Sequence, residues 1–315
     1  MKQQTRIDRA ACTFSGHETF VFRYAWLKKA ADAVADNPGV FNSDDAMVRL
    51  GVGKNMVRSI RHWGLATRVL EEVQRSRGNL LNVSHLGRTI LGSGGFDPYF
   101  EDPNSLWLMH WNLATNEEKS TTWCWTFNLF PASEFTRDAL AVFLEIEIDR
   151  RGMRAPSESS LRRDIDCFIR TYAPRRGGKE SIPEDSLDCP LTELGLLEED
   201  RTSGVLRFRS GSRPSLSDDV FLFCLAEFWD RVAPDRQSLA FSEVAYGFGS
   251  PGLVFKLDEN SLADRLERTE TTSQGVVTYT ESAGLKQLYR RDKIDKNQVL
   301  ARHYEQSMSA MLVGV

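Results

Sequence analysis

Three carboxylates in a proline-punctuated loop are the first candidates for chemistry in this sequence of 315 residues. Asp97, Glu101 and Asp102 lie between Gly95 and Pro103, and carboxylates gathered in this way can hold a divalent cation for phosphodiester cleavage. We therefore treat the three as candidate ligands for Mg2+ or Mn2+. The alternative is that they close the turn and cap the helix that follows, without binding a metal.

A second candidate is the adjacent pair His17 and Glu18, whose loop also contains Ser15 and Thr19. An imidazole close to a carboxylate and a hydroxyl can act as a general base or a metal ligand, which makes this pair the candidate catalytic residues. Adjacent residues need not face the same ligand, however, and the stretch can equally form an N-cap in which Glu18 bonds to backbone amides. His110 lies among apolar residues, which predicts a buried histidine with hydrogen-bond partners.

The elements that must position these residues begin with a helix, a turn and a helix. Apolar periodicity predicts helices over 22–35 and 44–50 and a further helix from Lys54. The intervening Gly51-Val52-Gly53 is typical of a helix-turn-helix motif. The apolar residues between Met56 and Trp63 recur at steps of three or four and point inward. The outward residues, which we expect to bind DNA, are Lys54, Asn55, Arg58, Arg61 and His62.

The residue types on this outward face suit different parts of a duplex. Asn55 and Arg58 are the candidates for base readout, because an amide and a guanidinium can each bond to a base edge at two points. Lys54 and Arg61 suit phosphate, where contacts fix orientation without carrying sequence information. The alternative is an ordinary helical core with a solvated basic face.

A basic hairpin follows the second helix of the motif. Short strands are predicted over 68–73 and 80–83, and the turn between them carries Arg75 and Arg77. Helix, turn, helix and hairpin together predict an N-terminal winged helix-turn-helix, with the hairpin as a second DNA-binding feature.

The charge of the chain is unevenly distributed. A net charge of -4 and a pI near 5.8 argue against a protein that is basic throughout. Residues 1–90 nevertheless hold 14 Lys and Arg against 8 Asp and Glu, a net of +6, while the remainder carries 26 against 36, a net of -10. This asymmetry favours nucleic-acid contact by the first domain, and protein contact or metal chemistry elsewhere.

The composition also indicates the cellular compartment of the protein. The five cysteines are widely separated and form no CxxC pair, so neither a disulfide framework nor a structural zinc site is indicated. No apolar run approaches the length of a membrane span, and the first residues lack the apolar stretch of a signal peptide. We expect a cytoplasmic protein without a membrane partner.

The rest of the chain predicts a helical, aromatic-rich middle region. Trp107, Trp111, Trp123 and Trp125 crowd into a stretch with few basic residues, which favours a core or subunit interface over a base-stacking platform. Further helices are predicted over 136–151 and 157–172, and a hairpin near 198–209. In the second of these helices, Asp164 and Asp166 are two residues apart and face different directions, which argues against a shared metal site.

The last segment predicts a second winged-helix-like unit. Helices are predicted over 218–232, 242–246, 259–268 and 282–290, with a strand over 276–280. The fold class is therefore mainly α with small β-hairpins (α+β). We divide the chain into a winged-helix DNA-binding domain (1–92), a helical middle domain (93–212) and a winged-helix-like C-terminal domain (213–315).

Several strings across most of the chain resemble those of a bacterial family long classed as a domain of unknown function, and in combination they are specific. They are Phe14-Ser15-Gly16-His17-Glu18-Thr19-Phe20, Arg23-Tyr24, Leu50-Gly51-Val52-Gly53-Lys54-Asn55-Met56-Val57, Asp97-Pro98, Glu101-Asp102-Pro103 and Leu106-Trp107-Leu108-Met109-His110-Trp111.

The resemblance implies a pathway. Members of this family are found with a cysteine desulfurase, an ATPase and a PAPS-reductase-like protein in systems that place phosphorothioate sulfur in DNA, and the family includes a DNA-nicking component of single-strand phosphorothioation. The resemblance identifies this pathway better than it identifies catalytic residues. No position of this chain matches a PD-(D/E)xK, HNH or GIY-YIG nuclease motif.

Three functional hypotheses follow. The leading one is a DNA-binding nickase of a phosphorothioation-based modification or phage-defence system, which uses Mg2+ or Mn2+ to open one strand for sulfur insertion. The second is a non-enzymatic subunit that recognises DNA for a sulfur-inserting partner. The third is a transcriptional regulator, which would bind a palindromic operator as a homodimer.

Overall fold

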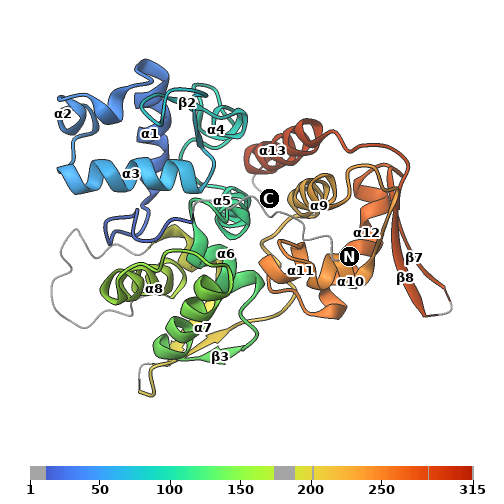
Figure 1. The fold of residues 1–315 in the computed structure, drawn as a ribbon. Helices are drawn as coiled ribbons and strands as arrows, with labels where there is room; N and C mark the ends of the chain where they lie inside the picture. Colours follow the sequence, from blue (N-terminus) through green and yellow to red (C-terminus); the bar gives the residue numbers. More distant parts are fainter. Residues whose placement is uncertain (1–11, 174–188, 201, 283, 314–315) are drawn as a thin grey trace.

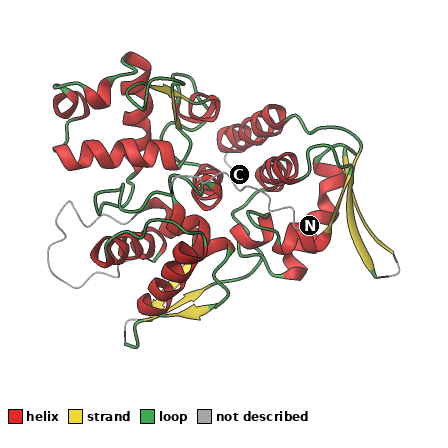
Figure 2. Cartoon of the chain, in the orientation of Figure 1, coloured by secondary structure: helices red, strands yellow, loops and turns green. Residues whose placement is uncertain are grey.

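The computed structural model of this chain describes residues 12–173, 189–200, 202–282 and 284–313. Within these ranges the chain is mainly helical with small antiparallel sheets, which confirms the predicted fold class (Figure 1, Figure 2). One continuous hydrophobic core joins all three predicted segments, from Phe22 to Leu300; the domain boundaries themselves stay a prediction. None of the described helices combines the length and the apolar character that crossing a bilayer requires.

The N-terminal unit contains the predicted helices and hairpin in the predicted order. Gly51 ends the second helix with a φ of 65°, in the left-handed region that glycine adopts without strain. The hairpin strands pair antiparallel, with Leu70 opposite Val83. The elements are α1 (Tyr24–Asp36), a 3-10 turn (Val40–Asn42), α2 (Ala46–Leu50), α3 (Lys54–Ala66), β1 (Leu70–Glu72), β2 (Leu81–Val83) and α4 (His85–Leu91).

The middle region is helical, as predicted, and also contains a small sheet. The predicted hairpin is extended by a third strand, which the sequence analysis missed, to give the order β3-β5-β4. The elements are α5 (Pro103–Thr115), α6 (Thr121–Asn128), β3 (Glu134–Phe135), α7 (Arg137–Arg150), α8 (Glu158–Tyr172), a 3-10 helix (Pro190–Leu194), β4 (Leu197–Asp200) and β5 (Val205–Phe208).

The C-terminal unit pairs a helical layer with a sheet of order β6-β8-β7. Its first helix packs against both of the longer helices that follow in the chain. The elements are α9 (Asp218–Val232), β6 (Ser238–Ala240), α10 (Phe241–Tyr246), α11 (Pro251–Val254), α12 (Glu259–Thr272), β7 (Val277–Ser282), β8 (Leu285–Arg290) and α13 (Lys296–Val313).

The helix predicted over 282–290 is wrong, because Leu285–Arg290 form β8. It pairs with β7 along six residues, from Val277 opposite Arg290 to Ser282 opposite Leu285. Burial alternates here, with Leu288 and Arg290 buried and Tyr289 exposed, which is the period of a strand with one covered face. The sequence analysis also missed α13, which packs on α9.

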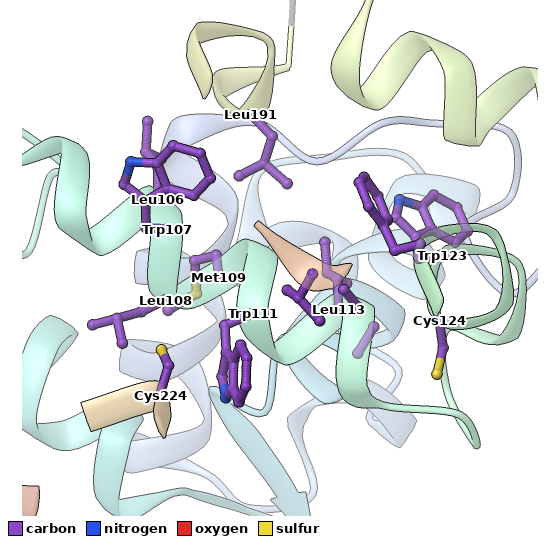
Figure 3. Packing of buried hydrophobic residues seen from close by; sticks show 14 of the residues in the cluster. Leu106, Trp107, Leu108, Met109, Trp111, Leu113, Trp123, Cys124, Leu191 and Cys224 are labelled. Atoms are coloured by element: carbon purple, nitrogen blue, oxygen red, sulfur yellow. The ribbon is translucent and has the colours of Figure 1, made fainter. Parts of the chain in front are cut away.

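At the centre of the molecule lies α5, which is buried on every side from Asn104 to Thr115. Figure 3 shows its apolar side chains next to Trp123 of α6, Leu191 and Cys224 of α9. Its tryptophans and those of α6 are at most 1% exposed, so the aromatic stretch is core, one of the two predicted alternatives. The five cysteines all lie in described segments, and none of them forms a disulfide.

The polar groups of α5 bond to several different elements. Nδ1 of His110 lies 2.8 Å from the Tyr172 hydroxyl of α8, and Nε2 lies 2.8 Å from the Val254 carbonyl oxygen of α11. The Asn112 amide donates to the Thr67 carbonyl at the end of α3, at 2.8 Å. His110 is thus the satisfied core histidine that was predicted, and burial lowers its pKa to about 3.

The contact between α4 and β1 offers a test of this packing. A Cβ at Gly87 would lie 2.3 Å from the Val69 carbonyl oxygen, whereas the nearest atoms to a Cβ at Gly39 would be 3.5 Å away, an ordinary contact distance. We therefore expect Gly87→Ala to destabilise the fold by about 1–3 kcal/mol through overpacking, and Gly39→Ala to unfold like the wild type. Urea denaturation measures both; equal midpoints for Gly87→Ala and the wild type would contradict this packing.

Candidate nucleic-acid interface and its supporting loop

The outward face of α3 begins at its N-terminus. Lys54, Asn55 and Arg58 are exposed, while Val57, Ile60 and Trp63 are buried, as the helical spacing predicts. In the part of the chain that the structure describes, the side chains of Lys54 and Asn55 make no hydrogen bond or ion pair. Two of the predicted DNA-binding side chains are therefore available to a ligand.

Arg61 links α3 to the hairpin. Its guanidinium donates to the Gly78 carbonyl oxygen at 3.0 Å and lies 3.6 Å from the Glu72 carboxylate. The same turn carries the exposed Arg75 and Arg77, both in the left-handed region with φ of 65° and 53°. Arg61 thus holds the arginine-bearing turn next to α3 and is itself engaged by protein groups.

His62 does not lie on the outward face, and its predicted exposure is wrong. Its residue is 9% exposed, because the loop before α1 covers this side of α3. Gly16 of that loop lies so close that a Cβ there would be 2.5 Å from Nδ1 of His62. Burial lowers the pKa of His62 to about 3. Nε2 is buried without a hydrogen-bond partner among the described residues.

The loop that covers His62 is anchored by His17 and Asp164, a residue of α8. His17 is fully buried; its Nδ1 accepts from the Thr19 amide at 3.0 Å, so Nε2 carries the proton that bonds to Oδ1 of Asp164 at 2.7 Å. Asp164 also accepts from the Ser15 amide at 2.7 Å and from the hydroxyl of Thr122. In this arrangement His17 has no free lone pair and no access to solvent, so it holds the loop rather than faces a ligand.

The loop is strained at three residues. Ser15, Glu18 and Thr19 have φ of 65°, 49° and 69°, in the left-handed region that non-glycine residues seldom occupy. Such strain persists only where the surroundings over-determine the backbone, and it clusters at functional sites. The loop lies between α3 and α8 in Figure 1 and is bonded to the latter through Asp164.

Glu18, the partner of His17 in the predicted catalytic pair, points elsewhere. Its carboxylate lies 3.3 Å from the Arg58 guanidinium, and its side chain is 34% exposed. The structure therefore separates the predicted pair: His17 is in the core, and Glu18 joins the basic face of α3. An accessible carboxylate stands within a predicted DNA-binding surface.

The predicted metal ligands serve the turn before α5. Asp97 accepts from the amides of Glu101 and Asp102, at 2.8 and 3.1 Å, and from the Ser105 hydroxyl at 2.6 Å. Asp102 is the N-cap of α5 and accepts from the Asn104 amide at 2.8 Å. Glu101 is exposed.

The second oxygen of Asp102 is also occupied. It lies 2.9 Å from Nε2 of His303, a residue of α13. Burial opposes the ionisation of Asp102, but the hydrogen bonds from His303 and Asn104 outweigh it and hold its pKa below the usual range. The oxygens of Asp97 and Asp102 are engaged by the turn and the helix cap, so these two carboxylates and the exposed Glu101 do not fit a divalent cation as arranged, and the turn-and-cap alternative describes Asp97 and Asp102. Across the described ranges, no three His, Cys, Asp or Glu side chains gather as a metal site.

Sequence reasoning missed the part that Asp164 plays. It predicted that Asp164 and Asp166 face apart, which is confirmed, since the first is buried and the second exposed. A usable signal was present, because Asp164 stands in the apolar stripe of Leu161, Ile165 and Phe168, and a buried carboxylate requires partners. Its partners lie almost 150 positions away in the sequence, where spacing gives no information.

Comparisons with known proteins identify the family. Residues 14–304 match the family described as "Protein of unknown function (DUF4007)". The chain belongs to the DUF4007 family. It is similar to a crystal structure of SspB, with 33% identity, a TM-score of 0.84 and coverage of 94% of this chain and 89% of that one. It is equally similar to a magnesium ion-bound crystal structure of SspB, with 34% identity, a TM-score of 0.84 and coverage of 93% and 88%.

These similarities confirm the family resemblance of the sequence: the protein is SspB-like. No curated protein matches the chain.

The burial of His62 predicts a pH dependence of stability. Its pKa is about 3 in the folded chain against an ordinary value of 6.5, so between these values the unfolded chain binds more protons. The free energy of unfolding should therefore fall as the pH falls from 6.5 towards 3, by about 1.4 kcal/mol per pH unit for each such group. His62→Asn should remove that contribution from the slope measured by urea denaturation between pH 6 and 4.

The quantity to compare is the slope of the free energy of unfolding against pH, because the smaller side chain of the variant lowers the free energy of unfolding itself at every pH. His110, buried in the same way, keeps its contribution in the variant. An unchanged slope in His62→Asn would mean that the imidazole is not held neutral in the folded chain.

Proposed function

We propose that this chain is a DNA-binding component of a DNA phosphorothioation system, and that it binds double-stranded DNA through an N-terminal winged helix. The observation that carries the proposal is the contact of Arg61 with the Gly78 carbonyl oxygen. Because of this contact, the basic outward face of α3 and the turn bearing Arg75 and Arg77 belong to one surface. In a winged helix, these two features enter or flank a groove together.

Charge supports this assignment. The first 90 residues carry a net charge of +6 within a chain of -4, so DNA is attracted to this end of the chain. Lys54 and Asn55 are exposed at the first turn of α3, where the helix dipole also favours phosphate. We assign Asn55 and Arg58 to base edges, and Lys54 with the two arginines of the turn to phosphates.

Similarity to SspB over nearly the whole chain supports the assignment to a pathway. The family resemblance associates such proteins with a cysteine desulfurase, an ATPase and a PAPS-reductase-like protein, which we propose as partners. We also propose a cytoplasmic location and the capacity to form a homodimer. The magnesium ion-bound structure of SspB makes Mg2+ the first cation to test, although the predicted ligands Asp97, Glu101 and Asp102 do not fit one as arranged.

The finer question is whether the chain nicks DNA or only recognises it. The burial of His17 favours the second candidate function, a recognition subunit for a sulfur-inserting partner, because a general base must reach its substrate. The accessibility of Glu18 beside Arg58 favours nicking, because a carboxylate at a phosphate-binding surface can orient or deprotonate an attacking water. The nickase candidate therefore requires the Glu18 carboxylate for the reaction, whereas the recognition-subunit candidate does not.

DNA binding is tested by Arg58→Ala, with Arg49→Ala as the matched control. Arg49 is an exposed arginine of neighbouring α2 whose charge is already paired with Asp36 and Asp45. We expect Arg58→Ala to weaken binding to double-stranded oligonucleotides by about 1–3 kcal/mol and to reduce base preference, as the loss of a base contact does. Fluorescence anisotropy at fixed salt measures both variants. Equal affinity of Arg58→Ala and the wild type would contradict the proposed interface.

Nicking is tested with Glu18→Gln on a supercoiled plasmid in the presence of Mg2+ or Mn2+. A nickase converts the plasmid to open circles, and loss of this product in Glu18→Gln with affinity retained or raised would assign the carboxylate to the reaction. Affinity should not fall, because the variant removes a negative charge next to Arg58. A wild-type protein that binds but leaves the plasmid supercoiled supports the recognition subunit instead.

A further inference from the structure

We propose that the DNA-binding surface continues from α3, across the loop of residues 15–19, onto α8, where Arg163 and Arg170 bind phosphates of the same duplex. This inference rests on the proposed DNA binding and extends it beyond the N-terminal unit. Neither arginine belongs to the residues that the sequence analysis assigned to DNA.

The continuity of the surface is given by two contacts with adjacent residues. The Arg58 guanidinium lies 3.3 Å from the Glu18 carboxylate, and the Arg170 guanidinium donates to the Thr19 carbonyl oxygen at 2.6 Å. The Cα atoms of consecutive residues are about 3.8 Å apart. One arginine from α3 and one from α8 therefore meet at a single dipeptide, and Figure 1 shows the loop between the two helices.

The charges of the two α8 arginines are not neutralised. Arg170 donates to the carbonyl oxygens of Thr19 and Asp166, and Arg163 donates to the Ser159 carbonyl oxygen and the Ser160 hydroxyl. These acceptors are uncharged. Within the described ranges, neither arginine has a carboxylate within ion-pair distance. The charges of both remain available to an anion, although Arg170 also contacts the loop through its hydrogen bond to Thr19.

Neighbouring arginines differ in this respect. Arg162 lies 3.0 Å from the Glu158 carboxylate and 2.8 Å from that of Asp138. Arg137 of α7 is paired with Asp166 and Glu199, at 3.2 and 2.7 Å. The exposed surface around α8 therefore contains both neutralised and unneutralised arginines, and one of the unneutralised ones, Arg170, contacts the loop that carries Glu18.

The spacing suits a nucleic-acid backbone. Arg163 and Arg170 are seven residues apart, which is about two helical turns or 10 Å along one face of α8. The carboxylate between them, Asp166, is occupied by Arg137. Residues beyond 90 carry a net charge of -10, so two unneutralised arginines on one face of α8 would attract a strand that leaves α3 against the charge of the surrounding region.

The experiment is a salt titration of affinity for a double-stranded oligonucleotide, using Arg163→Ala, Arg170→Ala and the matched control Arg162→Ala. Each lost phosphate contact lowers the slope of log K against log salt by about 0.9, which corresponds to about a fivefold weaker affinity at 0.15 M salt. We expect this change for Arg163→Ala and Arg170→Ala, equally on specific and scrambled duplexes, and no change for Arg162→Ala.

The outcomes separate this inference from the proposed function. If both α8 variants bind like the wild type while Arg58→Ala weakens binding, the extension onto α8 is refuted and DNA binding stands. If Arg58→Ala also binds DNA like the wild type, the proposed DNA binding through α3 and its extension onto α8 are both refuted. A loss in Arg162→Ala equal to that in Arg163→Ala would refute a localised contact. Arg170→Lys keeps the charge and should retain the slope of log K against log salt. A loss of slope as large as in Arg170→Ala would mean that Arg170 acts by holding the loop. In that case Arg163→Ala alone decides whether α8 binds phosphates.

Discussion

The burial of α5 on every side is the constraint on which the rest of the fold depends. A helix with tryptophan, leucine and methionine around its whole circumference has no face that can meet water, so other elements must enclose it. Its polar groups then determine which elements do so. His110 bonds to α8 and α11, Asn112 bonds to the end of α3, and the cap Asp102 bonds to His303 of α13. Since an unpaired buried polar group costs about 1–3 kcal/mol, these bonds select one arrangement of the surrounding helices.

The pair of His17 and Asp164 plays a comparable part for the candidate site. A carboxylate that is 1% exposed is tolerated because it accepts bonds from the imidazole, the Ser15 amide and Thr122. The same hydrogen bonds fix the loop of residues 15–19, whose backbone is strained at three residues. The strained loop presents Glu18 to Arg58, so a buried hydrogen-bonded pair sets the position of an exposed carboxylate. A histidine can thus be essential to a site without contacting the ligand.

The sequence predicted those parts of the molecule that are encoded locally. Helical spacing gave α1, α3, α7, α8 and α9, and Asp102 caps α5, as one of the two predicted alternatives for the acidic loop stated. The failures share a cause in contacts between distant residues. His62 is buried by a loop 46 positions earlier that packs through Gly16, and β8 is a strand because β6 and β7 flank it. The acidic residues near α5 were recognised as a cluster, but only the structure shows that the oxygens of Asp97 and Asp102 already accept hydrogen bonds from the protein.

Element order alone does not make a surface for DNA, as the two ends of this chain illustrate. The C-terminal unit repeats a sequence of helices followed by a hairpin, and its sheet order of β6-β8-β7 places the hairpin beside α12. The exposed side chains of α12 include Glu259, Asp264, Glu267 and Glu270, whereas those of α3 are basic or amide. Phosphates would be repelled by the first helix and attracted by the second. We therefore base the proposed DNA surface of the N-terminal unit on the distribution of charge rather than on topology, and the same criterion is our reason for extending that proposal to the unneutralised arginines of α8.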